Sequence, residues 1–98
     1  MASRHKPGAV TRFILGFEFK AETKTSQSYG RYIDVTIVRP RAACPDAEFR
    51  RAMFELRDHA RRRFAKAVMV EVPESMLNVF VGAGFTRPTG WEKHVLVI

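Results

Sequence analysis

The strongest constraint on the fold of this chain is a long amphipathic segment that leads directly into a short, almost wholly apolar one. Residues 45–64 carry apolar side chains every three or four positions, at Phe49, Ala52, Met53, Leu56, Ala60 and Phe64. Pro45 opens the segment with two acids close behind, and three arginines close it, which suits both ends of a helix. Residues 67–72 carry no polar side chain until Glu71, as is typical of a strand buried on both faces. A helix that leads into such a strand predicts a parallel strand pair.

The remaining segments predict three strands and a second helix. Residues 9–22 are interpreted as one long strand, 23–28 as a turn, and 29–39 as a second strand that pairs antiparallel with the first. Residues 74–83 predict a short helix and 93–98 a last strand, with a brief extra strand at 85–87. The sequence therefore predicts an α/β fold, a single small domain with a mixed, mostly antiparallel sheet, two helices and the order β-β-α-β-α-β.

Composition narrows the class of protein and its partners. We expect one domain over residues 9–98, preceded by a flexible basic tail at 1–8 that lacks the apolar core of a secretory signal. The formal net charge of +7 favours an acidic protein surface, a nucleic acid or a phosphorylated cofactor, although a solvated basic surface explains it equally. A single cysteine excludes an internal disulfide, and no apolar run reaches the roughly 18 residues of a membrane span. We expect a soluble, cytoplasmic protein that does not bind membranes.

A set of motifs in fixed order suggests a family. Val38-Arg39-Pro40 precedes the long helix, and Gly84-Phe85 follows the short helix, before the closing segment Trp91–Ile98. Over residues 10–98 this order resembles a minimal domain of the GNAT-type acetyltransferase superfamily, without the family's usual first strand and first two helices. The resemblance implies an α/β fold, acetyl-CoA as cofactor and an amine as acceptor.

The phosphate-binding loop of that family is altered in this chain. The family holds the pyrophosphate of acetyl-CoA with an R-x-x-G-x-G/A loop, where glycines and free N–H groups at a helix start approach the anion. Residues 41–48 contain no glycine, Pro45 has no N–H, and Asp46 and Glu48 repel phosphate. The residues that could still hold the cofactor are Arg39, Arg41, Ala42, Ala43 and Cys44.

The family's acid–base groups are also largely missing. Many members place a tyrosine four residues before the glycine of Gly-Phe, and this chain has Phe80 there, which has no proton to donate. Asp34 is the one candidate for a catalytic base in the matching strand, and the alternative interpretation is a solvent-facing residue of an alternating strand. Cys44 has no histidine at a spacing that would make it a nucleophile, and the histidines and cysteine do not form a metal-ligand pattern, so no metal is expected.

Partner binding is predicted on the polar side of the long helix. The residues expected to contribute are Arg50, Arg57, Arg61, Arg62 and the anchor Trp91. The alternative is a solvated face with ion pairs such as Asp58–Arg61 and Asp58–Arg62. A homodimer could form if the last strand is unpaired and accepts a second copy.

The leading hypothesis is a GNAT-like protein that acts mainly by binding a macromolecule, most readily a protein, without standard acetyl transfer and without a cofactor. Its small size fits the compact regulators or inhibitors that phages and mobile elements carry. The first alternative is an active acetyl-CoA-dependent N-acetyltransferase. The second is a basic nucleic-acid-binding protein, whose binding must weaken as salt rises.

Overall fold

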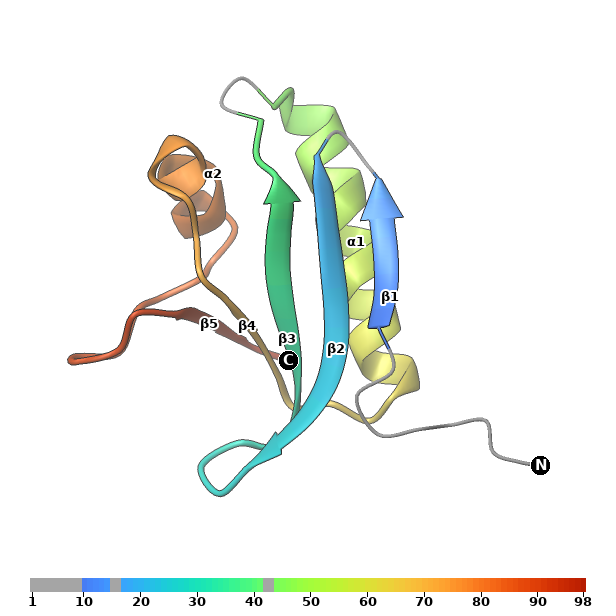
Figure 1. Cartoon of the computed structure of the whole chain (residues 1–98), viewed down its shortest axis with the longest axis vertical. Helices are drawn as coiled ribbons and strands as arrows, with labels where there is room; N and C mark the ends of the chain where they lie inside the picture. Colours follow the sequence, from blue (N-terminus) through green and yellow to red (C-terminus); the bar gives the residue numbers. More distant parts are fainter. Residues whose placement is uncertain (1–9, 15–16, 42–43) are drawn as a thin grey trace.

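The computed structural model describes residues 10–14, 17–41 and 44–98 and contains one five-stranded sheet with its helices on one face (Figure 1). The tail expected at residues 1–8 lies outside the described residues. The elements are β1 (Val10–Ile14), β2 (Glu18–Ser26), β3 (Gly30–Arg39), α1 (Asp46–Arg62), β4 (Ala67–Val70), the 3₁₀ turn η1 (Glu74–Met76), α2 (Leu77–Gly82) and β5 (His94–Val97).

The sheet has the order β1-β2-β3-β4-β5, and three of its four strand pairs are antiparallel. β3 and β4 run parallel because α1 carries the chain back across the sheet between them. This confirms the predicted mixed, mostly antiparallel sheet with two helices. Beyond β5, Thr86 forms an isolated bridge to Val95 where a brief extra strand is predicted. The bridge occupies outward backbone groups of Val95, which limits strand addition by a second copy at this edge.

The prediction of one long strand over residues 9–22 is wrong. The chain folds back into the hairpin β1–β2, and β2 then continues to Ser26 through most of the segment predicted as a turn. Phe13 and Phe19 are direct partners in this hairpin, and their rings stack with centroids 4.8 Å apart. In a single strand, six residues would hold the same rings about 20 Å apart. The hairpin therefore packs both rings into one core, and the order of elements becomes β-β-β-α-β-α-β.

The main core lies between the sheet and the two helices. Its aromatic centre consists of Phe17, Phe19, Phe49, Phe80 and Phe85, each at most 4% exposed. All four residues of β4 are buried, as predicted for a strand covered on both faces. On the opposite sheet face, a smaller apolar cluster gathers around Met69 and Val95 beneath Tyr29 and Tyr32.

The two helix ends are set by backbone geometry. Gly84 follows α2 with a φ of 100°, a conformation that suits glycine, and Phe85 then turns back into the core with 1% exposure. Phe64, predicted to complete the apolar stripe of α1, instead lies beyond the helix and is 78% exposed. The last buried residues of the helix are His59 and Ala60. Among the described residues, the longest helix is too short and too polar to cross a bilayer.

Candidate functional site

A groove of about 700 Å³ lies between α1 and α2. Its residues are Asp46, Phe49, Arg50, Met53, Phe54, Arg57 and Arg61 on the α1 side and Asn78, Val79, Gly82 and Ala83 on the α2 side. Phe49 and Met53 are buried and form an apolar floor, whereas Phe54 stands on the rim with 67% exposure. The groove therefore offers apolar surface that the fold itself leaves open to solvent.

The two walls of the groove differ in charge. Arg50, Phe54, Arg57 and Arg61 follow one another at spacings of four, three and four residues, so they share one side of α1. The α2 wall, from Leu77 to Gly82, contains no charged residue. Of the described groove residues, the one acid is Asp46, and its carboxylate accepts from Arg50 at 2.7 Å. The result is an apolar trough with one cationic wall.

Arg57 links the two walls of the groove. Its Nη2 donates to the carbonyl oxygen of Ala83, just after α2, at 3.4 Å. A cation at a helix C-terminus complements the negative end of the helix dipole. Arg57 therefore helps to hold α2 against α1, and its side chain also lines the groove.

The structure brings together three of the five residues predicted to bind a partner. Arg50, Arg57 and Arg61 line the groove, but Arg62 pairs with Asp58 at 2.8 Å, as the ion-pair alternative predicts. Trp91 lies outside the groove residues and packs edge-on against Tyr29, with ring centroids 6.0 Å apart. Sequence reasoning missed Phe54, although a phenylalanine off the apolar stripe of an amphipathic helix was the available signal.

Both arginines predicted to hold a cofactor pair with carboxylates. Arg39 pairs with the buried Glu18 at 3.2 Å, and Arg41 pairs with Glu48 at 2.8 Å. Cys44 is buried, and burial, aided by Glu48, raises the pKa of its thiol despite the opposing effect of Arg41. Ala42 and Ala43 lie outside the described residues. Because Glu48 engages Arg41 beside the start of α1, the local charge is balanced rather than ready for an anion.

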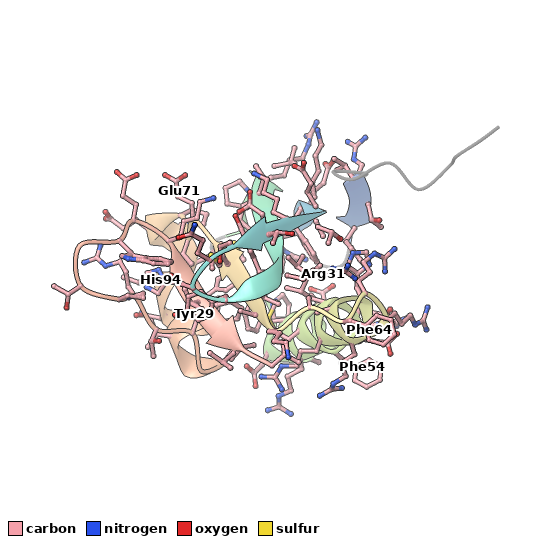
Figure 2. All side chains as sticks on the ribbon, turned by 90° about the horizontal axis from the view of Figure 1, so that it is seen from below. Tyr29, Arg31, Phe54, Phe64, Glu71 and His94 are labelled. Atoms are coloured by element: carbon pink, nitrogen blue, oxygen red, sulfur yellow. The ribbon has the colours of Figure 1, made fainter. Side chains whose placement is uncertain are left out.

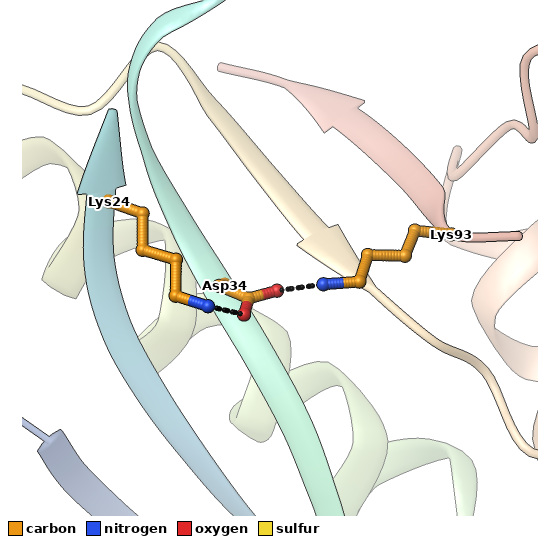
Figure 3. A network of polar contacts seen from close by, with 3 residues as sticks. All are labelled: Lys24, Asp34 and Lys93. Atoms are coloured by element: carbon orange, nitrogen blue, oxygen red, sulfur yellow. Dashed lines mark hydrogen bonds and ion pairs between the residues drawn. The ribbon is translucent and has the colours of Figure 1, made fainter. Parts of the chain in front are cut away.

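Asp34 is neither solvent-facing nor set up as a base. It is 7% exposed and accepts hydrogen bonds from Lys24 at 2.8 Å and Lys93 at 2.7 Å, on the sheet face opposite the helices (Figure 3). Burial alone raises the pKa of Asp34, but the hydrogen bonds and charges of the two lysines outweigh it and leave the pKa below its usual value. A carboxylate with a lowered pKa is a weak proton acceptor at neutral pH. The geometry makes Asp34 a clamp that ties β2, β3 and the start of β5 together.

Asp34→Asn is expected to lower the free energy of unfolding at pH 7 by about 1–2 kcal/mol, because two charge-assisted hydrogen bonds are weakened. Since the folded pKa is lowered, the stabilisation is present above the unfolded pKa of about 3.9 and disappears as pH falls through the folded pKa. Urea titrations at pH 7 and pH 2.5 measure this, with exposed Glu71→Gln on the same face as control. Equal losses at both pH values would contradict the clamp.

The end of α1 holds an exposed aromatic residue in a strained backbone conformation. Ala65 N–H bonds to Ala60 at 2.9 Å and Phe64 N–H bonds to Arg61 at 3.0 Å, which is the Schellman pattern. Phe64 occupies the position where glycine is usual, with φ 56°. Figure 2 shows Phe54 of α1 and Phe64, just beyond α1, projecting away from the sheet, while Glu71 lies on the other side of the molecule.

Phe64→Gly is expected to raise the free energy of unfolding by about 1 kcal/mol, because it relieves the left-handed strain and removes a ring that is largely exposed. Thermal and urea unfolding measure the change. Phe54→Ala, which removes an exposed ring from an ordinary helical position, serves as control and should shift stability by less than about 0.5 kcal/mol. A loss of stability in Phe64→Gly would mean that the ring packs in solution.

The two described histidines are buried in the main fold rather than gathered at a site. Burial, with smaller contributions from Arg63 and Arg62, lowers the pKa of His59 to about 4. Its ring meets Phe13 edge-on, with centroids 5.3 Å apart. Nδ1 of His94 is buried without a hydrogen-bond partner in the described structure, and burial and Arg87 lower the pKa of that ring as well. Within the described residues, His, Cys, Asp and Glu side chains form no group that could hold a metal ion.

The chain matches no protein-family model, no curated protein and no solved structure.

Proposed function

We propose that this protein acts by binding another protein in the groove between α1 and α2, as a small regulator or inhibitor with a GNAT-like fold. The observation that carries the proposal is the hollow of about 700 Å³ whose apolar floor is bordered by three arginines and an exposed phenylalanine. Arginine and aromatic side chains around apolar pockets contribute much of the affinity of protein interfaces. A cytoplasmic location belongs to the proposal, supported by a single cysteine that is buried and free.

The layout of charge favours a protein over a nucleic acid at this groove. Phosphate-backbone binding draws on cationic side chains and gains little from an apolar floor. Here the cations stand on one wall only, and the facing α2 wall is neutral. A polypeptide with both apolar and acidic side chains satisfies the floor and the cationic wall together.

Acetyl transfer is the second candidate function, favoured by one observation. A cavity of about 330 Å³ opens where the parallel strands β3 and β4 stop pairing, beyond Val35 and Val70, and the carboxyl ends of parallel strands are a common place for ligands. The paired Arg41, the paired Asp34 and the buried Phe80 weigh against catalysis there. Calorimetry with acetyl-CoA is expected to give no low-micromolar binding, and such binding would favour the acetyltransferase instead.

Obstructing the groove tests the proposed function. A Cβ added at Gly82 meets no atom within 4 Å, and Gly82 lines the groove, so Gly82→Leu is expected to place its side chain in the groove. The partner is first identified with a photo-crosslinking residue in place of the exposed Asn78, and is then purified. Its affinity for Gly82→Leu is expected to fall by about tenfold or more, or about 1.4 kcal/mol.

The control variant adds a leucine on α1, outside the groove. Ala47 is exposed near the start of α1 and does not line the groove, so Ala47→Leu should leave the affinity unchanged. Thermal unfolding confirms that both variants fold. A partner that binds Gly82→Leu as tightly as the original protein, or that crosslinks from Thr36 on the open sheet face instead of Asn78, contradicts the proposal.

A further inference from the structure

We infer that the groove receives a short acidic amphipathic helix, with its carboxylates toward α1 and its apolar edge toward α2. This inference rests on the proposed protein-binding function and adds the conformation, chemical class and orientation of the bound segment. Three independent features of the groove carry it: its backbone chemistry, the spacing of its arginines and the open space at Gly82.

The backbone chemistry of the groove excludes strand addition and favours a helix. Both walls are helices, so neither presents the open strand edge with which an extended peptide pairs. An extended segment would lay unpaired polar backbone groups over the apolar floor of Phe49 and Met53, which is costly. A helix satisfies its own backbone and presents only side chains. From Arg50 to Arg61 the cationic wall extends about 16 Å, or three helical turns.

The arginine spacing selects carboxylates on one edge of the bound helix. Arg57 and Arg61 are four residues apart on α1, which corresponds to about 6 Å along the axis, the same step that separates two glutamates at i and i+4. Arg61 is exposed, and no ion pair is found for it among the described residues. Arg57 donates one hydrogen bond to Ala83 and has further N–H groups for a carboxylate. Two acids one turn apart therefore match this wall.

The α2 wall sets the opposite edge of the bound helix. Val79 and Ala83 line it with apolar atoms, and Asn78 adds an uncharged polar side chain. Gly82 leaves the space that a Cβ would occupy, so a second helix can approach α2 closely there. Small and apolar partner side chains fit this wall, whereas a charged one would lose its hydration without an opposite charge. The bound helix thus has one preferred rotation about its axis.

A displayed peptide library tests the inference without a known partner. Each peptide is a helix of about five turns with an alanine-based frame, and its surface positions are randomised among Glu, Lys, Gln and Leu. Selection on the intact protein is expected to enrich Glu over Lys by about tenfold at positions one turn apart on one edge, with Leu on the opposite edge. Selection on Arg61→Glu should replace one enriched Glu by Lys, and selection on Gly82→Leu should remove the enrichment.

The outcomes separate this inference from the proposed function. Absence of enrichment, enrichment of acids without helical spacing, or an unchanged result with Gly82→Leu each overturns the acidic-helix inference. If the crosslinked partner still depends on Gly82, protein binding in the groove stands and only the nature of the bound segment is wrong. If the affinity of the partner is also unchanged by Gly82→Leu, both the proposed protein binding in the groove and the acidic-helix inference fail.

Discussion

Replacing Phe80 by alanine is expected to lower the free energy of unfolding by about 3–5 kcal/mol. Phe80 is fully buried and meets three other rings edge-on, those of Phe49 and Phe85 at 5.2 Å and that of Phe17 at 6.1 Å between centroids. The alanine variant loses the buried surface of the ring. It also leaves a cavity in the core between the two helices and the sheet. Because small domains are stable by only about 5–15 kcal/mol, this change removes a large part of the total. Urea titration followed by circular dichroism measures it.

Phe80→Tyr separates packing from chemistry at the same position. The resemblance to acetyltransferases places a proton-donating tyrosine here, but the ring of Phe80 is enclosed by other aromatic side chains. A buried hydroxyl without a partner is expected to cost about 1–3 kcal/mol and to confer no acetyl transfer. Phe64→Tyr, on an exposed ring, should leave stability nearly unchanged. A tyrosine variant that is as stable as the original and gains activity would show that position 80 reaches a catalytic site.

The protein is expected to lose about 2–3 kcal/mol of stability as pH falls from 6.5 to 4, because of His59. His59 is buried against Phe13 and close to Arg62 and Arg63, so its neutral form is favoured and its folded pKa is about 4. In the unfolded chain the same histidine takes up a proton below its ordinary pKa of 6.5. The unfolded state therefore binds more protons across this window, and stability is complete above pH 6.5 and falls toward pH 4.

His59→Leu tests the assignment because it removes the titrating group and keeps an apolar side chain in the core. The slope of unfolding free energy against pH between 6.5 and 4 should flatten in this variant. His94 acts in the same direction, since its pKa is also lowered, and His94→Leu measures its share. Asp34 contributes mainly below this window, because its pKa lies below the ordinary carboxyl value. If the slope is unchanged in His59→Leu, other titrating groups cause the pH dependence of stability.

The elements that local pattern controls could be predicted well from the sequence. The stripe of α1, the uniformly apolar β4 and the Gly84-Phe85 end of α2 each depend on neighbours within a few residues. All three are present, although α1 ends at Arg62, before Phe64, and β4 ends at Val70 instead of residue 72. The parallel pairing of β3 and β4 followed as well, because a helix between two strands allows few other connections.

Pairings between distant residues could not be predicted. The period-two pattern of residues 9–22 fits one strand or two, and the stacking of Phe13 on Phe19 decides for the hairpin. Phe64 follows the spacing of the helix stripe, but the chain leaves α1 before it and turns its ring outward. Asp34 fits the alternation of a solvent-facing residue, yet lysines ten and fifty-nine residues away enclose it.

One wall of the candidate site could be predicted from the sequence and the other could not. The charge and the period of residues 45–64 are local properties, so they predict a basic, amphipathic helix in an α/β domain. The groove that Arg50, Arg57 and Arg61 line is visible in three dimensions alone, because its second wall comes from α2, which follows β4 in the chain. The groove lies between two helices that pack on the same sheet and meet at Phe49–Phe80 and Arg57–Ala83, and the sequence of neither helix encodes the distance between them.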